Sequence, residues 1–258
     1  MTAIITLTTD FGTTDPFVGI MKGVIAGRAP AARVVDLTHG IPPQDVLAGA
    51  LVLQHAAPYF PPGTIHVAVV DPGVGGDRKP LCVEMARAFL VGPDNGLLSL
   101  AAPPVEVRRI VHLADERFRL SPPSATFHGR DVFAPAAAAL AAGTPARELG
   151  PELSAMDRLE VPAPIAEAST IRGEVIYVDH FGNLVTNVPE AALRGRALSI
   201  GLRGERVRGL ARAYSAVAPG EPVAVINSWG LLEIAVRDGS ARAVLGARVG
   251  DPVQVEVR

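Results

Sequence analysis

The sequence predicts an N-terminal α/β sandwich with a largely parallel sheet, followed by a small C-terminal antiparallel β-barrel. Over the first two thirds of the 258 residues, short apolar runs alternate with helical patterns, which is typical of parallel sheets covered by helices. From Ile171 onward the chain reads as short strands with glycine-rich turns, which favours a barrel. Between these regions, Pro151 to Ser169 lacks periodicity. We therefore predict an α/β domain over residues 1–160, a linker over 161–170 and a barrel over 171–258.

The strands of the first domain are predicted from near-continuous apolar runs, as expected where both faces of a sheet are covered. The first helix is well signalled, because Asp15 can cap it and Pro16 suits its first turn. The predicted strands are Ile4–Thr8, Arg33–Val35, Ile65–Val70, Leu81–Met85, Phe89–Val91 and Arg109–His112, and the predicted helices are Pro16–Ala26, Asp45–Ala56, Leu97–Ala101 and Val132–Ala142.

The second domain is predicted to contain strands only. Its apolar runs are short and are separated by turn signals such as Arg203-Gly204-Glu205 and Asp238-Gly239. The predicted strands are Glu174–Val178, Leu184–Val188, Leu198–Leu202, Arg206–Ala211, Pro222–Ile226, Leu232–Val236 and Val253–Val257.

The composition excludes several classes of protein. Lys and Arg number 24 against 26 Asp and Glu, a net charge of −2, which argues against binding to nucleic acid or a membrane surface. With 48% hydrophobic residues, the chain is not generally disordered. A single cysteine, Cys82, excludes an internal disulfide framework and a cysteine-based zinc site. Because neither a basic leader nor an apolar stretch of bilayer length is apparent, we expect a cytoplasmic protein.

Polar residues end four of the apolar runs of the first domain. These are Asp10, Asp36, Asp71 and the pair Asp94-Asn95. Ligands of α/β sheets bind beyond the carboxyl ends of the strands, so we expect these groups to meet at one edge. The alternative is that each residue only stops a strand and starts a turn, which is the commonest use of Asp and Asn.

Two segments of the first domain have the chemistry of a catalytic site. In the segment from Asp71 to Arg78, glycines allow close approach of the backbone to a ligand, and the acid and the guanidinium can pair. In Phe127-His128-Gly129-Arg130-Asp131, the imidazole precedes a helical run and can face the same cleft, although a structural role is the commoner one. The first βα turn has no phosphate-binding glycine motif, no predicted helix has metal-ligand spacing, and no G-x-S-x-G elbow for a serine nucleophile exists.

Two turns of the second domain carry polar groups. Asp179-His180-Phe181-Gly182-Asn183 lies between two predicted strands, and Asn227-Ser228-Trp229-Gly230 follows another. Both are plausible hairpin turns. Their carboxylate, amides and hydroxyl also suit an amino-acid zwitterion or the edge of a purine.

Taken in order, six motifs resemble one family, the S-adenosylmethionine hydroxide adenosyltransferases, formerly a domain of unknown function and related to the fluorinating and chlorinating enzymes. The resemblance covers nearly the whole chain. The motifs that carry it are Thr9-Asp10-Phe11-Gly12, Asp71-Pro72-Gly73-Val74-Gly75, Pro93-Asp94-Asn95-Gly96, Phe127-His128-Gly129-Arg130-Asp131, Phe181-Gly182-Asn183 and Asn227-Ser228-Trp229-Gly230.

The resemblance implies hydrolysis of S-adenosylmethionine to adenosine and methionine, with water or hydroxide attacking the 5′ carbon of the ribose. S-adenosylmethionine is then the substrate, and no cofactor and no metal are expected. The resemblance also implies a homotrimer, with active sites between the N-terminal domain of one subunit and the C-terminal domain of its neighbour.

The family's catalytic set falls on Asp71, Arg78 and His128. Because Arg78 beside Asp71 favours the charged carboxylate and weakens it as a base, a role in orienting water gains weight. The implied substrate-binding residues are Asp10 for the ribose diol, Asn183 for the adenine edge, Tyr214 for stacking on the ring, Asp179 and Ser228 for the methionine amino and carboxylate groups, and Glu233 and Val236 near the nucleoside.

Two other functions stay open at the level of sequence. A non-catalytic protein that binds adenosine or S-adenosylmethionine needs only Asp10, Asn183 and Tyr214. A halogenase that uses S-adenosylmethionine is disfavoured, because the halogenating relatives have Tyr in place of the Asp and lack the His.

Overall fold

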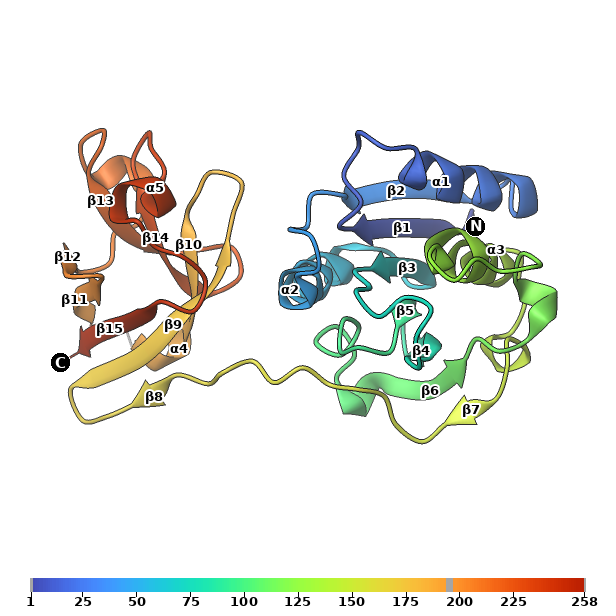
Figure 1. The fold of residues 1–258 in the computed structure, drawn as a ribbon. Helices are drawn as coiled ribbons and strands as arrows, with labels where there is room; N and C mark the ends of the chain where they lie inside the picture. The colour runs from blue at the N-terminus through green and yellow to red at the C-terminus, as the bar shows by residue number, and fades with distance from the viewer. Residues whose placement is uncertain (1, 194–196, 258) are drawn as a thin grey trace. The chain divides into compact units, whose positions relative to one another are not determined.

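The computed structural model describes residues 2–193 and 197–257. The chain divides into two compact units, Met1–Leu159 and Glu160–Arg258 (Figure 1). The first unit is built around one seven-stranded sheet, and the second around an eight-stranded antiparallel sheet. The predicted fold class is confirmed. Among the described residues, none of the helices has both the length and the apolarity that crossing a bilayer requires.

The sheet of the first unit has the strand order β2-β1-β3-β5-β4-β6-β7 and is mixed. The pairs from β2 to β5 are parallel, and the pairs from β5 to β7 are antiparallel. The connection between β4 and β5 is so short that it permits only an antiparallel hairpin. The prediction of a largely parallel sheet did not take the length of this connection into account. The elements are β1 (Ile4–Thr9), α1 (Phe17–Arg28), β2 (Arg33–Thr38), α2 (Val46–Ala56), β3 (Thr64–Val69), β4 (Pro80–Met85), β5 (Ala88–Pro93), β6 (Val107–His112), α3 (Ala134–Ala141) and β7 (Glu152–Leu153).

The core of this unit lies between the sheet and two helices. Ile5 and Leu7 alternate along β1 and are fully buried, and they belong to the same cluster as Met21 and Ile25 of α1. The alanines of α3 complete that cluster, and α1 contacts α3 directly. The small side chains of α3 allow the helices to approach closely, so the turn that precedes α3 is supported by a tightly packed core.

The predicted helices of this unit need three corrections. No helix forms over Leu97–Ala101, which is a run of turns, because Asn95 Oδ1 accepts from the Leu97 N–H at 3.2 Å and so binds the backbone in a turn. Helix α1 begins at Phe17, and its first turn has no side-chain cap from Asp15. The run predicted from Val132 begins as a π-helical turn over Gly129–Phe133 and continues as α3.

The sheet of the second unit has the order β12-β11-β15-β9-β10-β14-β13, and β8 also pairs with β9. Its first and last strands, β12 and β13, contact each other, so the sheet nearly closes into a barrel. The elements are β8 (Ile165–Ala166), β9 (Thr170–Val178), β10 (Leu184–Pro189), α4 (Glu190–Leu193), β11 (Ala197–Leu202), β12 (Glu205–Arg208), β13 (Pro222–Ile226), β14 (Leu231–Val236), α5 (Ala241–Leu245) and β15 (Pro252–Val257).

The prediction that this unit contains strands only is wrong at α4, at α5 and at a 3₁₀ turn over Tyr214–Ala216. Ser240 caps α5 through its hydroxyl, which accepts from the Ala243 N–H at 3.2 Å, and Gly246 ends it in the left-handed conformation. Helices of four and five residues are too short to show a 3.6-residue period. The strand predicted to reach Ala211 ends at Arg208, before Gly209 with a φ of 62°.

Candidate active site

The carboxyl ends of three neighbouring parallel strands meet at one edge of the first unit's sheet. Strand β3 lies between β1 and β5, with Thr9 opposite Val69 and Val67 opposite Val91. Asp10 directly follows β1, and Asp71 follows β3 by two residues. The topology therefore brings these two carboxylates to neighbouring positions.

The other polar strand ends serve the fold. Asp36 lies within β2 and binds Lys22 Nζ at 2.6 Å. Asp94 accepts from the Asp157 N–H at 2.7 Å, and Asn95 donates to the Val70 carbonyl at 2.9 Å. Of the four expected positions, only Asp10 and Asp71 remain candidate site residues.

Asp71, Arg78 and His128 form one hydrogen-bonded cluster. Arg78 donates through Nε to Asp71 Oδ1 at 2.9 Å and through Nη2 to Asp71 Oδ2. The same Nη2 lies 2.7 Å from His128 Nδ1. The side chains of Asp71 and Arg78 are only 5% and 9% exposed, so little water screens their attraction. Three residues predicted as a catalytic set thus lie in direct contact.

The geometry fixes the proton on His128. Because a guanidinium only donates, Nδ1 of His128 accepts from Arg78, and the ring proton lies on Nε2. Burial, and then the positive charge of Arg78, lower the pKa of His128 below its ordinary value. His128 is therefore a neutral imidazole that presents an N–H donor away from Arg78.

The loop that carries Asp71 and Arg78 depends on one glycine. Gly75 has a φ of 77°, and a Cβ at this position would collide with the carbonyl oxygen of Ala125. Only glycine allows this loop to approach the segment before His128 so closely. The same contact explains how residues fifty positions apart in the sequence come within hydrogen-bonding distance.

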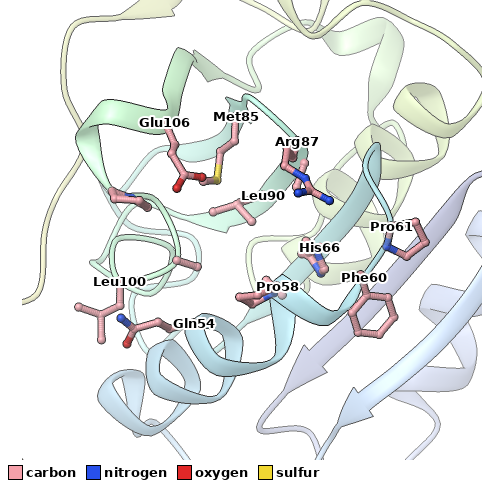
Figure 2. A pocket seen from close by; sticks show the side chains of 14 residues that line it. Gln54, Pro58, Phe60, Pro61, His66, Met85, Arg87, Leu90, Leu100 and Glu106 are labelled. Carbon is pink, nitrogen blue, oxygen red and sulfur yellow. The ribbon is translucent and has the colours of Figure 1, made fainter. Parts of the chain in front are cut away.

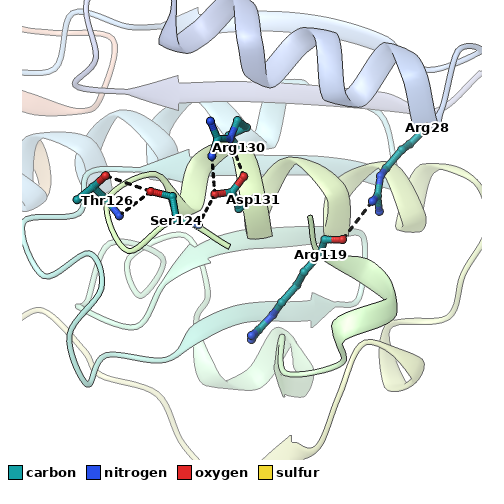
Figure 3. A network of polar contacts seen from close by, with 6 residues as sticks. All are labelled: Arg28, Arg119, Ser124, Thr126, Arg130 and Asp131. Carbon is teal, nitrogen blue, oxygen red and sulfur yellow. Dashed lines mark hydrogen bonds and ion pairs between the residues drawn. The ribbon is translucent and has the colours of Figure 1, made fainter. Parts of the chain in front are cut away.

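The segment before His128 is fixed by a buried carboxylate (Figure 3). Asp131, 1% exposed, accepts from the Ser124 N–H at 2.7 Å and from Arg130 Nε at 2.6 Å. The Arg119 carbonyl accepts from Arg28 of α1 at 3.1 Å. These contacts join the loop to α1 and to the turn over Gly129–Phe133, which sets the position of the imidazole.

Asp10 lies in a turn that packs against the His128 segment. Its Oδ2 accepts from the Gln44 N–H at 2.8 Å. The neighbouring Phe11 ring contacts Phe17 and Phe127, each with centroids 6.0 Å away. Because Phe127 precedes His128, this aromatic cluster brings the two turns together.

A cavity of about 340 Å³ lies beside the cluster and is lined by Arg78 and His128. Lys79 and Arg119 also line it, together with His112. Burial, and then the positive charges of Arg119 and Lys79, lower the pKa of His112. The imidazoles beside these fixed cations are therefore held in the neutral form.

A second cavity of the first unit, of about 400 Å³, holds none of the predicted site residues (Figure 2). It lies at the opposite ends of β3 and β5, where His66, Phe60 and Leu90 line it. His66 is 1% exposed and binds the Thr6 hydroxyl at 2.8 Å. Burial lowers its pKa to about 4, so this histidine is a neutral core residue, as its place in a strand indicates.

The second unit contains a cavity of about 690 Å³ that gathers four of the predicted residues: Asp179, Asn183, Tyr214 and Val236. Asp179 Oδ1 accepts from the Asn183 N–H at 2.8 Å, and Oδ2 accepts from the Asn183 side-chain amide at 3.0 Å. Tyr214 lines this cavity and is 44% exposed. A cavity of this size suits a small organic molecule.

Glu233 lies behind Tyr214 and is 4% exposed. Its carboxylate accepts from the Tyr214 hydroxyl at 2.7 Å and from the Asn227 amide at 3.2 Å. Burial raises the pKa of Glu233, and burial together with this hydrogen bond raises the pKa of Tyr214 to about 12. Tyr214 therefore stays protonated and its ring orientation is fixed.

The turn that carries Ser228 is organised by its neighbour Asn227. Asn227 Oδ1 accepts from the Trp229 N–H at 2.9 Å and from the Leu231 N–H at 3.2 Å. Ser228 itself is exposed and does not line the 690 Å³ cavity. Asn227 is the residue that the sequence reasoning left out, although it stands in the quoted motif. A side chain that bonds both its own turn and Glu233 is recognisable only in the structure.

Among residues 2–193 and 197–257, no three His, Cys, Asp or Glu side chains lie together as a metal site needs. The fold and its clusters define a small-molecule enzyme of two units, one α/β and one barrel-like. Family models identify it further: the SAM hydroxide adenosyltransferase N-terminal domain matches residues 5–150, and the C-terminal domain matches residues 173–254. The chain belongs to the SAM hydroxide adenosyltransferase family, as its motifs indicated.

Known relatives agree with this assignment. The chain is 45% identical to an (R)-S-adenosyl-L-methionine hydrolase of Thermus thermophilus, over 95% of this chain and 96% of the relative. It is also similar to the crystal structure of an uncharacterized conserved protein from Thermotoga maritima, with a TM-score of 0.90 and 35% identity, covering 97% of this chain and 99% of that one. A fluorinase of Actinoplanes is more distant, at 27% identity over 90% of each chain.

Proposed function

We propose that this protein hydrolyses S-adenosylmethionine to adenosine and methionine, by attack of water on the 5′ carbon of the ribose. The observation that carries the proposal is the hydrogen-bonded Asp71–Arg78–His128 cluster at the carboxyl edge of the sheet, in which the side chains of Asp71 and Arg78 are nearly buried. Membership of the family and the names of the relatives support the same reaction.

The protein does not need to activate the leaving group in this reaction. The water oxygen bonds to the 5′ carbon, the carbon–sulfur bond breaks, and its electron pair goes to sulfur. The positively charged sulfonium becomes neutral methionine, and the water releases one proton to solvent. Holding the reactants in line can supply about 7–11 kcal/mol, so positioning dominates over acid–base catalysis.

The cluster suits the orientation of water. Both oxygens of Asp71 already accept from Arg78, which fixes the carboxylate, and their remaining lone pairs can accept from water. His128 offers its Nε2–H as a donor to the water oxygen. We assign Asp71 and His128 as the groups that hold the water, and Arg78 as the group that holds both of them.

The remaining residues bind the substrate. Asp10 accepts hydrogen bonds from the ribose diol. In the second unit, Asn183 forms hydrogen bonds with the edge of adenine, and Tyr214 stacks on the adenine ring. Asp179 and Ser228 take the methionine amino and carboxylate groups, with Glu233 and Val236 next to the nucleoside. The exposure of Ser228 is compatible with this role only if another surface closes over it.

We assign the protein to homotrimers whose sites combine the first unit of one subunit with the second unit of its neighbour. Mixing Asp71→Ala with Asn183→Ala subunits tests this arrangement. At equal amounts, random assembly gives intact sites at about one quarter of positions, because each half of a site is unmutated half the time. Activity above the sum of the two variants is expected, and no recovery in verified mixed trimers contradicts it.

The direct test of function is product identity. Purified protein is incubated with S-adenosylmethionine in water alone and with chloride or fluoride, and the products are separated by chromatography. Adenosine and methionine in equal amounts in every sample support hydrolysis. A 5′-halogenated nucleoside would indicate a halogenase, and unchanged substrate with measurable adenosine binding would indicate a binding protein.

A further inference from the structure

His39 joins two strands beside the Asp10 turn. It follows β2 directly and is 7% exposed. Its Nδ1 lies 2.9 Å from the Thr9 hydroxyl, at the end of β1, and its Nε2 lies 3.0 Å from Asp36 Oδ1. Thr9 immediately precedes Asp10, the residue proposed to bind ribose. The ring of His39 therefore contacts the direct neighbour of Asp10 in the chain.

Thr9 and His39 link β2 to the backbone of the Asp10 turn. The Phe11 N–H donates to Thr9 Oγ1 at 3.2 Å, and the same hydroxyl forms a hydrogen bond with His39 Nδ1 whose direction is set by the tautomer of the ring. His39 Nε2 lies close to the Asp36 carboxylate, at a distance of an ion pair but without the geometry of a hydrogen bond. Lys22 binds the other oxygen of that carboxylate at 2.6 Å. Together these contacts connect α1 and the end of β2 with the backbone on both sides of Asp10.

The segment that begins at His39 also holds the turn through its backbone. The Gly12 N–H donates to the His39 carbonyl at 2.8 Å, and the Ile41 N–H donates to the Thr9 carbonyl at 3.4 Å. The Gln44 N–H donates to the Asp10 carboxylate at 2.8 Å. Residues 39–44 therefore fix both the backbone and the carboxylate of the turn.

We propose that His39 is a positioning residue, which sets the Asp10 carboxylate for the ribose diol through the Thr9 hydroxyl. This inference rests on the proposed function, in which Asp10 binds ribose. Since His39 acts through Thr9 on a binding group, its loss is expected to weaken binding of the nucleoside and to leave the chemical step nearly unchanged.

The chain offers a matched control in His66. Both histidines are buried, and each binds a β1 threonine through Nδ1, at 2.9 Å for His39 with Thr9 and 2.8 Å for His66 with Thr6. Only His39 lies at the carboxyl edge of the sheet. A general loss of stability appears in both variants, whereas loss of positioning appears only at His39.

The experiment compares His39→Leu with His66→Leu. For His39→Leu we expect KM for S-adenosylmethionine to rise about 10-fold with kcat within about 3-fold, because a displaced binding group costs affinity. The dissociation constant of adenosine, measured by calorimetry, should rise in parallel. His39→Asn should restore most of the affinity, because its side-chain amide can donate to the Thr9 hydroxyl or accept from it. His66→Leu should lower the melting temperature without changing KM.

A second variant keeps the test decisive if His39→Leu folds poorly. Thr9→Val removes the hydroxyl and should raise KM as His39→Leu does, and the double variant should be no worse than the poorer single one. Unchanged adenosine affinity in His39→Leu and Thr9→Val, or a fall in kcat alone, overturns the inference. If the wild-type chain releases no adenosine, the proposed function fails, whereas the calorimetry still decides on His39.

Discussion

The two units present their candidate site groups in opposite ways. In the first unit, Asp71 and Arg78 are charged, nearly fully buried and bonded to each other, and the neighbouring cavity is small, about 340 Å³. In the second unit, the Asp179 carboxylate, the Asn183 amide and the half-exposed Tyr214 ring line a cavity of about 690 Å³. A fixed charged cluster suits the orientation of one water molecule, and a larger cavity suits the recognition of a nucleoside. The comparison predicts that variants of the first cluster affect turnover and variants of the second unit affect binding.

The largest effect is expected from the cluster. Asp71→Ala and His128→Ala each remove a group that holds the water, so kcat should fall by about 10²- to 10⁴-fold. Binding of adenosine, measured by calorimetry, should be nearly unchanged. A wild-type rate in both variants would show that the cluster takes no part in the reaction.

The pH dependence of kcat follows from the neutral His128. Protonation of Nδ1 breaks its contact with Arg78, so activity should be lost as the pH falls through the lowered pKa of His128. The acid limb should therefore have its midpoint below 6.5, the ordinary value of histidine. In His128→Asn this limb should disappear from the residual activity. A midpoint above 6.5 would contradict the assigned protonation state.

Substrate binding should respond at Asp10 and Asn183. Each substitution by alanine removes hydrogen bonds to the nucleoside, a loss of about 1–3 kcal/mol that corresponds to roughly 5- to 150-fold in KM. We expect kcat at saturating substrate to change much less. Steady-state kinetics with both variants check this, and an unchanged KM for either one removes that residue from the site.

The stability of the first unit should depend on His66, which lies outside the cluster. The folded protein lowers the pKa of His66 from 6.5 to about 4, so the unfolded chain binds a proton first as the pH falls. Between pH 6.5 and 4 the free energy of unfolding should decrease by up to about 3 kcal/mol from this group. Denaturant titrations of wild type and His66→Leu measure the difference. An equal pH slope for the two proteins would contradict the burial argument.

The smallest effect is expected at Tyr214. Tyr214→Phe keeps the ring for stacking and removes only the hydroxyl that donates to Glu233, so KM should rise about 5-fold. Tyr214→Ala, which also removes the ring, should raise KM further. If the two variants are equal, the hydroxyl rather than the ring carries the effect.

The sequence allowed the grouping of some candidate residues to be predicted, whereas their roles in the site stay predictions. The rule that parallel strands end at one edge selected Asp10 and Asp71, but it also selected Asp36 and Asp94-Asn95, whose contacts within the fold only the structure shows. The contact of Arg78 with His128 needed the family resemblance, since it depends on the approach of Gly75 to Ala125, which no local pattern encodes.

Other features depended on contacts that lie outside any one motif. The mixed sheet follows from the short β4–β5 connection, and α5 follows from the cap of Ser240. The role of Asn227 depends on Glu233, which lies on the next strand. In each case the sequence contains a local signal, but the structure that it forms depends on contacts with other residues.

The origin of the 5′ oxygen of adenosine shows whether water attacks the 5′ carbon of the substrate. Wild-type protein is incubated with S-adenosylmethionine in ¹⁸O-labelled water, and the masses of adenosine and methionine are measured, with Asp71→Ala as the control. Attack of water at the 5′ carbon predicts one labelled oxygen at the 5′ hydroxyl of adenosine, none in methionine, and little product from the variant. Unlabelled adenosine, or labelled adenosine formed equally fast by Asp71→Ala, would contradict the role of the cluster.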